Sequence, residues 1–226
     1  MVLTIDIGNT TIGIGGFQGN KLLFIEKISS RRPLSDAGYI EKLNMILNKH
    51  GLSAEAFEGS MISSVVPSVT AVFSSALETF LGRKPLILSH KLDLGYEICT
   101  EFPEKVGCDR LADIAGAISR YSLPFVTIDL GTATTFNVLD ENRRFLGGLI
   151  LPGVGTAHRA LLGKTAQLPK GDIHMPAHTI GANTQECITG GMLLGNACAI
   201  DGLIRHIQTE RSEERRVGKE CRSRWS

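Results

Sequence analysis

Two short motifs with the residue types of a phosphate-binding site occur in this sequence, one at its start and one in its second half. The first, residues 6–10, reads DIGNT, and the second, residues 129–134, reads DLGTAT. In each, a glycine lets backbone N–H groups approach phosphate oxygens, and short hydroxyl or amide side chains add donors. The carboxylate can hold a cation that offsets phosphate charge. We name residues 6–13 the first clamp and residues 129–134 the second clamp. Two such clamps facing one cleft would suit a nucleotide.

A lone Asp-x-Gly is also an ordinary junction between a strand and a turn, because both residues are common in turns. Here both copies stand between an apolar strand and a second strand of alternating residues, which contains Ile12 and Ile14 in one half and Phe136 and Val138 in the other. A motif repeated in the same context predicts two related halves.

The elements around the clamps follow from hydrophobic periodicity and turn residues. The first half reads as a β-rich opening followed by alternating strands and helices, the pattern of a ribonuclease-H-like unit, and the second half repeats the clamp. We expect strands at 21–29, 60–65, 85–88, 125–130 and 145–151, and helices at 36–48, 68–81, 109–121, after 155 and at 184–207. The predicted fold class is α/β with duplicated ribonuclease-H-like domains at 1–110 and 111–210 and a nucleotide cleft between them.

Bulk composition is that of a soluble globular enzyme. The 226 residues are 42% hydrophobic and 21% charged, with a formal net charge of +1. We found no apolar run approaching the ~20 residues of a membrane span and no signal peptide, so we expect a cytoplasmic protein that binds neither membrane nor nucleic acid. The five cysteines are an odd number without a Cys-x-x-Cys pair, which favours reduced thiols over a disulfide framework or zinc site.

Weaker patterns point to no other site. His174 and His178 have the spacing of a helical zinc site, but Pro176 between them predicts a loop. The Gly163-Lys164-Thr165 segment lacks the upstream glycine of a P-loop, and no Gly-x-Gly-x-x-Gly follows a strand.

The last sixteen residues, 211–226, differ in character from the rest of the chain. They contain six Arg or Lys and three Glu without apolar periodicity. A basic tail for nucleic acid is one interpretation, but the segment resembles the translation of a sequencing adapter. We therefore interpret it as a non-native tail and expect the natural chain to be cut off near Glu210.

Beyond the two clamps, further segments form a combination that is distinctive for one family. They are residues 63–67 (SSVVP), 107–110 (GCDR), 147–153 (GGLILPG), 165–169 (TAQLP) and 180–184 (IGANT). With them, the chain resembles type III pantothenate kinases, which belong to the acetate and sugar kinase, Hsc70 and actin superfamily, over Met1 to about Glu210. The resemblance implies an actin-like ATPase architecture.

The resemblance also implies roles for individual residues. ATP phosphates would lie on Asp6, Ile7, Gly8, Asn9, Thr10, Thr11, Ile12, Gly13 and Thr132. Asp129 resembles the family's ligand for a monovalent cation, K⁺ or NH₄⁺, and Mg²⁺ would accompany the nucleotide. Pantothenate would bind Gly107, Cys108, Asp109 and Arg110, with Asp109 taking the proton from its primary hydroxyl. Thr184 is similar to a residue that binds pantothenate across a dimer interface, which implies a homodimer.

Three of these residues also have structural interpretations. Asp109 stands where an N-cap is expected for the helix that follows, and such a cap is compatible with a catalytic role because phosphoryl transfer demands mostly positioning and charge neutralisation. Arg110 could bind the pantothenate carboxylate as a planar fork or be a charge on the helix surface. Thr184 could cap the last helix.

The chain departs from the family pattern at several positions. Gly13 replaces a frequent lysine, which removes one positive phosphate contact. Thr100 stands where a tyrosine often covers pantothenate, Cys108 replaces an alanine, and Asp113 stands where asparagine is common. A Thr-Gly-Gly-like segment, which usually lies near the nucleotide in this family, is not found, and its absence would weaken or remove activity.

Three functions therefore stay open. The first is phosphorylation of pantothenate by ATP, the first step of coenzyme A synthesis. The second is a kinase of the same superfamily acting on another small polyol or acid. The third is a non-catalytic nucleotide sensor or transcription-accessory protein.

Overall fold

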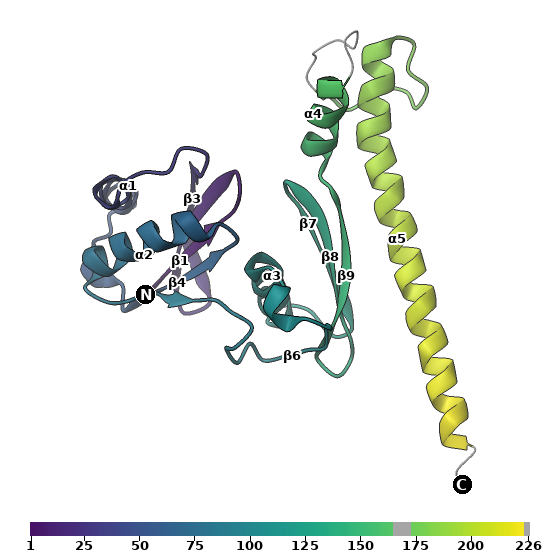
Figure 1. Ribbon diagram of the computed structural model, residues 1–226, viewed down its shortest axis with the longest axis horizontal. Helices are drawn as coiled ribbons and strands as arrows, with labels where there is room; N and C mark the ends of the chain where they lie inside the picture. Colours follow the sequence, from purple (N-terminus) through teal and green to yellow (C-terminus); the bar gives the residue numbers. More distant parts are fainter. Residues whose placement is uncertain (165–172, 224–226) are drawn as a thin grey trace. The chain divides into compact units, whose positions relative to one another are not determined.

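A computed structural model describes residues 1–164 and 173–223, with side chains up to Ser212. The chain divides into two compact units, Met1–Leu151 and Pro152–Ser226. The domain limit at 110 that the sequence predicts lies within the helix Cys108–Ile118 of the first unit, and the division into two ribonuclease-H-like domains stays a prediction. The first unit contains both sheets and both clamps (Figure 1).

The first sheet has the strand order β3-β2-β1-β4-β5. Strands β1 (Val2–Ile7), β2 (Thr11–Gln18) and β3 (Lys21–Ser29) form an antiparallel meander, whereas β4 (Gly59–Ser64) and β5 (Leu86–Ile87) run parallel to β1. Along β1, Leu3, Ile5 and Ile7 are buried and the residues between them face outward, which is the period-two pattern of a strand with one face on a core.

Helices α1 (Asp36–Lys49) and α2 (Pro67–Leu81) cover this sheet. Ser35 caps α1 by accepting a hydrogen bond from the Gly38 backbone, and Gly82 ends α2 in the left-handed conformation, at φ 66°, that glycine adopts without strain. The Tyr39 and Phe73 rings pack with centroids 4.5 Å apart. The first core therefore joins both helices to the sheet. A short 3₁₀ turn, Ala54–Ala56, precedes β4.

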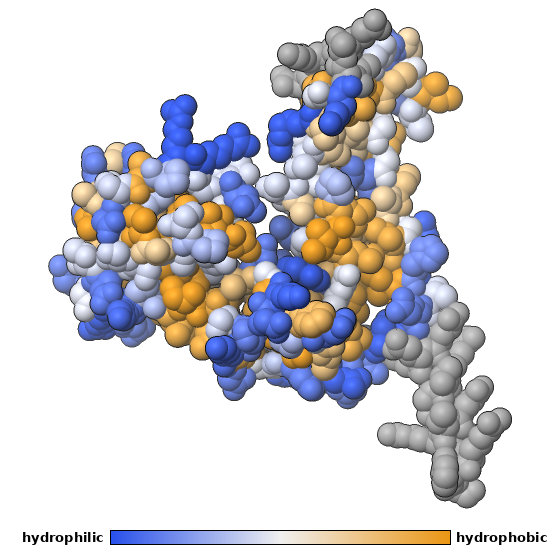
Figure 2. Space-filling view, viewed as in Figure 1, coloured by the Kyte–Doolittle hydropathy of each residue, from blue (hydrophilic) through white to orange (hydrophobic). Residues whose placement is uncertain are grey.

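The second sheet has the strand order β6-β9-β8-β7. It comprises β6 (Glu97–Ile98), β7 (Phe125–Leu130), β8 (Ala133–Leu139) and β9 (Arg144–Pro152). A 3₁₀ turn (Pro103–Lys105) and helix α3 (Cys108–Ile118) precede β7, and α3 packs on β7 and β8. The buried core here is small, with Ile114, Leu139 and Phe145 at its centre. Apolar residues also gather at the surface in this part of the view (Figure 2). In this sheet, Leu130 and Ile150 are exposed.

The second unit contains helices α4 (Val154–Lys164) and α5 (Thr184–Ser223). Asn183 caps α5, because its side-chain oxygen accepts from the Glu186 backbone N–H at 3.0 Å and its side-chain nitrogen donates to the Glu186 carboxylate at 2.8 Å. The predicted end of this helix, Ile207, was wrong: α5 continues to Ser223, through most of the segment that we interpret as a non-native tail.

Part of α5, Thr184–Ser212, is long and apolar enough to cross a membrane by length and composition. The expectation that no apolar stretch approaches such a length was therefore wrong. The buried core helix of a globular protein passes the same test, so one such helix is weak evidence for a membrane span.

Candidate active site

The two clamps have the same backbone design. Asp6 is the penultimate residue of β1, and Asp129 is the penultimate residue of β7. The glycine that follows each strand closes the turn: the Gly8 N–H donates to the Thr11 carbonyl at 2.9 Å, and the Gly131 N–H donates to the Ala133 carbonyl at 2.9 Å. Each turn leads directly into the antiparallel partner strand, β2 or β8. The sequence repeat is thus a structural repeat.

The two turns meet in the folded chain. The Thr10 and Thr132 hydroxyl oxygens lie 3.2 Å apart, although the residues are 122 positions apart in the sequence. The carboxylates of Asp109 and Asp129 lie close enough to Asp6 for their charges to act on it. Partial burial raises the pKa of Asp6, and the charges of Asp109 and Asp129 raise it further, while Lys27 and a hydrogen bond act in the opposite direction. The two clamps are therefore in contact, and the acidic residue at the start of α3 acts electrostatically on the first clamp.

Helix α3 presents Asp109 in its first turn. The N-cap is Gly107, so the expectation that Asp109 caps this helix was wrong. Its Oδ1 accepts instead from the Arg110 backbone N–H at 2.8 Å. A Cβ at position 107 would meet Asp109 Oδ1, so a side chain there would make this carboxylate move. The Cys108 thiol donates to the Leu88 carbonyl at 3.1 Å and so ties α3 to the segment after β5.

Arg110 lies half-buried against the second sheet. Its Nε donates to the Asn137 side-chain oxygen at 2.6 Å, and its Nη2 donates to the Phe136 carbonyl at 3.2 Å. The guanidinium carbon lies 5.3 Å from the centre of the Phe145 ring. The alternative of a charge on the helix surface is therefore wrong. Burial lowers the pKa of Arg110, and the nearby acids Asp109 and Asp113 oppose that shift.

No carboxylate among the described residues lies within ion-pair distance of the Arg110 guanidinium. Its hydrogen-bond partners are a neutral amide and a neutral carbonyl. A half-buried cation whose direct hydrogen-bond partners are neutral is suited to an anionic ligand, because the ligand supplies the ion-pair partner that the described residues do not.

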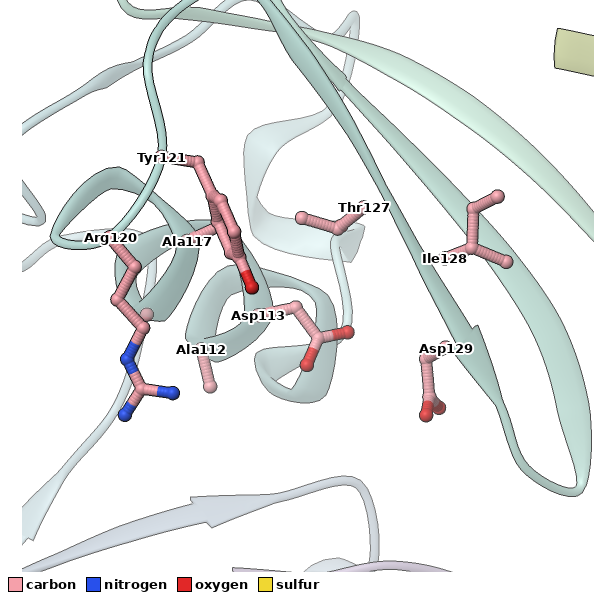
Figure 3. A pocket seen from close by; sticks show the side chains of 9 residues that line it. Ala112, Asp113, Ala117, Arg120, Tyr121, Thr127, Ile128 and Asp129 are labelled. Carbon is pink, nitrogen blue, oxygen red and sulfur yellow. The ribbon is translucent and has the colours of Figure 1, made fainter. Parts of the chain in front are cut away.

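Asp113 lines a pocket of about 370 Å³ between α3 and β7. Figure 3 shows its carboxylate between the helix and the strand that carries Thr127 and Asp129. Burial, followed by the charges of Asp129, Asp109 and Asp6, raises the pKa of Asp113 to about 7, and Arg110 opposes the shift. Sequence analysis noted this residue only as a departure from the family pattern. Its electrostatic setting depends on three aspartates from separate elements.

Other predicted residues have distinct settings. Gly13 pairs with Asp6 across the β1–β2 hairpin. The Thr100 hydroxyl is buried without a hydrogen-bond partner among the described residues. Thr184 lies in the second unit as the first residue of α5, where Asn183 supplies the cap, so the capping interpretation of Thr184 was wrong. The motif at residues 165–169 lies outside the part of the chain that the structure describes. All the other quoted motifs lie within it.

Comparison with known proteins identifies the family. A family model for type III pantothenate kinase matches residues 2–206. The chain belongs to the type III pantothenate kinase family. It is 36% identical over 214 residues to a type III pantothenate kinase of Thermomicrobium roseum, which covers 95% of this chain and 83% of that protein. It is 34% identical over 210 residues to one of Moorella thermoacetica, with 93% and 83% covered.

A solved structure resembles the chain in fold. It is a Campylobacter jejuni protein described as a Baf family transcriptional activator, with a TM-score of 0.52 and 17% identity, covering 89% of this chain and 78% of that one. At this identity the likeness concerns the fold alone. Together with the family match and the two related sheets, it confirms the predicted α/β fold class.

Proposed function

We propose that this chain is an ATP-dependent pantothenate kinase that forms 4′-phosphopantothenate, the first step of coenzyme A synthesis. The observation that carries the proposal is the meeting of the two clamps through Thr10 and Thr132, with the charge of Asp109 acting on Asp6 of the first clamp. Two glycine turns and an acidic group at one place are what transfer of a phosphoryl group from a nucleotide to an alcohol requires. Membership of the pantothenate kinase family indicates that the alcohol that accepts the phosphoryl group is pantothenate.

The nucleotide phosphates would lie on the first clamp, from Asp6 to Gly13, and on Thr132. The Asp129 carboxylate is exposed at the end of β7 and fits a monovalent cation, K⁺ or NH₄⁺, which needs few charged ligands. The described residues contain no group of three or more acidic, His or Cys side chains that could hold a metal ion. Mg²⁺ would therefore be held mainly by the phosphates of ATP, as is usual for this ion.

Pantothenate would bind along Gly107, Cys108, Asp109 and Arg110. Arg110 offers a cation whose protein partners are neutral, which supports a role in binding the carboxylate of this substrate. Asp109 would accept the proton of the primary hydroxyl as its oxygen bonds to the γ-phosphorus and the bond to the ADP oxygen breaks. The contribution of such a base is about 10²-fold in rate, and positioning supplies much of the rest.

Thr184 would bind pantothenate from the partner subunit of a homodimer. Capping by Asn183 is consistent with this role, because the exposed Thr184 is then not the residue that caps the helix. We further propose that the protein is cytoplasmic and that it acts on neither nucleic acid nor membranes.

The test is ADP release by the full chain with Mg²⁺-ATP and potassium, with and without pantothenate. Asp109→Asn should lower kcat by about 10²-fold while ATP binding and the fold stay unchanged. Glu104→Gln, which removes an exposed acid from the same region, is the matched control. Unchanged turnover in Asp109→Asn would remove Asp109 from the chemistry. ATP binding without pantothenate-dependent ADP release would favour a nucleotide sensor, and release with a different small alcohol would favour another substrate.

A further inference from the structure

Asn137 is a fully buried polar residue in the middle of β8, with a relative exposure of 0%. It forms two side-chain hydrogen bonds. Its Oδ1 accepts from Arg110 Nε at 2.6 Å, and its Nδ2 donates to Thr127 Oγ1 at 3.0 Å. Thr127 is its direct partner on β7 in the antiparallel register. A buried amide satisfied on both sides is held in one orientation, because turning it over would place donor against donor at Arg110.

This amide orientation determines how Arg110 is held. Thr127 Oγ1 accepts the hydrogen bond of the amide nitrogen Nδ2, so the amide oxygen Oδ1 faces the guanidinium Nε and accepts from it. The Phe136 carbonyl then binds Nη2, and the Phe145 ring lies against the guanidinium. Among the residues that the structure describes, Nη1 has no hydrogen-bond partner, so a ligand could bind there.

The absence of a side chain at Gly148 lets β9 approach the Phe136 carbonyl and the Arg110 guanidinium closely. A side chain at position 148 would collide with the Phe136 carbonyl and would reach within 3.1 Å of Arg110 Nη2. Backbone and side chains of three segments thus hold the guanidinium in place. An aspartate could also accept from Nε, but it would neutralise the cation, whereas asparagine orients Arg110 and leaves its charge for the ligand.

We propose that Asn137, oriented by Thr127, is a positioning residue that presents the Arg110 guanidinium to the carboxylate of the acceptor substrate. The proposal rests on the proposed function, in which Arg110 binds the acid group of pantothenate. Asn137 does not touch the substrate and acts only through Arg110.

The test compares Asn137→Leu with Asn142→Leu, which makes the same chemical change in an exposed position of the β8–β9 turn. With the full chain, Asn137→Leu should raise KM for pantothenate about tenfold or more, because a misplaced Arg110 weakens substrate binding, while kcat and KM for ATP change less than about threefold. Asn142→Leu should leave all three values unchanged. An unchanged pantothenate KM in Asn137→Leu overturns the proposal.

A neutral analogue, pantothenyl alcohol, separates positioning from general damage. It carries a hydroxymethyl group in place of the carboxylate, so its inhibition constant should differ by less than about twofold between wild type and Asn137→Leu. An equal loss of affinity for pantothenate and the analogue overturns the proposal. Asn137→Asp should keep the fold and also raise pantothenate KM, because the new carboxylate neutralises Arg110; a normal KM in this variant contradicts the argument from charge.

Thr127→Val provides a milder variant if Asn137→Leu fails to fold. It removes the acceptor that orients the amide and should raise pantothenate KM a few fold without changing KM for ATP. An unchanged KM there overturns the proposal. Absence of pantothenate-dependent ADP release in the wild type would overturn the proposed function, and this proposal with it, whereas an active wild type with an unaffected Asn137→Leu variant overturns the positioning role alone.

Discussion

Replacement of Asp113 by asparagine is expected to stabilise the fold, and to do so more at pH 8 than at pH 5. The pKa of Asp113 is raised from 3.8 to about 7 by burial and by the charges of Asp129, Asp109 and Asp6. A carboxyl group with a raised pKa is unfavourable in the folded state when it is ionised. Asparagine has nearly the same shape and cannot ionise, so it removes this cost.

The sign follows from proton binding. Below about pH 4 both the folded and unfolded states are protonated at Asp113, and there is no penalty. As pH rises from about 4 to 7 the unfolded chain releases this proton while the folded chain keeps it, so the free energy of unfolding falls. Above about pH 7 the folded state also ionises, and the loss is complete.

The magnitude follows from the size of the shift. Each pKa unit corresponds to about 1.4 kcal/mol, so the full shift would cost about 4 kcal/mol. Because Asp113 lines an open pocket and solvent screens its neighbours' charges, we expect about half of this, about 2 kcal/mol. A cost of about 2 kcal/mol corresponds to about 1.5 pKa units, and about a third of it arises between pH 5 and pH 8, so the stability advantage of Asp113→Asn should widen by about 0.6 kcal/mol over this range.

The assay is urea unfolding of wild type and Asp113→Asn at pH 5 and pH 8, at equal ionic strength. Glu41→Gln, which removes an exposed acid from α1, is the control and should show no widening. The same stability difference at both pH values would refute the reasoning, because it would mean that Asp113 ionises as readily in the folded chain as in the unfolded one.

Two further predictions concern the clamps. Gly13→Lys should lower KM for ATP by about three- to tenfold, because a Cβ at this position meets Asp6 Cβ at an ordinary 3.8 Å and the ammonium would lie near the phosphates; Gly13→Ala is the control, and equal KM values in both variants would contradict the charge argument. Replacement of potassium by sodium at constant ionic strength should remove most activity, because the smaller ion holds its water more tightly, and Asp129→Ala should abolish this difference. Equal rates of the wild type in both salts would rule out the cation role.

Local patterns made most of the fold predictable. Both hairpins were predicted from alternating apolar residues and from the glycines after Ile7 and Leu130. This works because strand alternation and turn formation depend on residues that are adjacent in the sequence. Helix α2 was predicted at 68–81 and found at Pro67–Leu81. The two-residue strand β6 was missed, because so short a strand has no period and depends on its pairing with β9.

The site was predictable in its motifs and less so in its supporting residues. The meeting of Thr10 with Thr132 agrees with the inference from the repeat. Asn137 went unnoticed, because an asparagine within an alternating strand gives no sign of burial until Arg110 from α3 packs against it. The cap of α5 was placed one residue too late, on Thr184, although Asn183 and Glu186 have the spacing of a capping box.

The unequal cores of the two sheets have a consequence for the order in which the chain folds. Every buried member of the first core lies between Leu3 and Leu77, and the last strand of that sheet ends at Ile87. The second clamp's Thr132 is made 45 residues later, which at about 5–20 residues per second is a delay of about 2 to 9 seconds. The first sheet, with the first clamp, is therefore able to fold during synthesis. The second clamp then packs against a first clamp that is already folded.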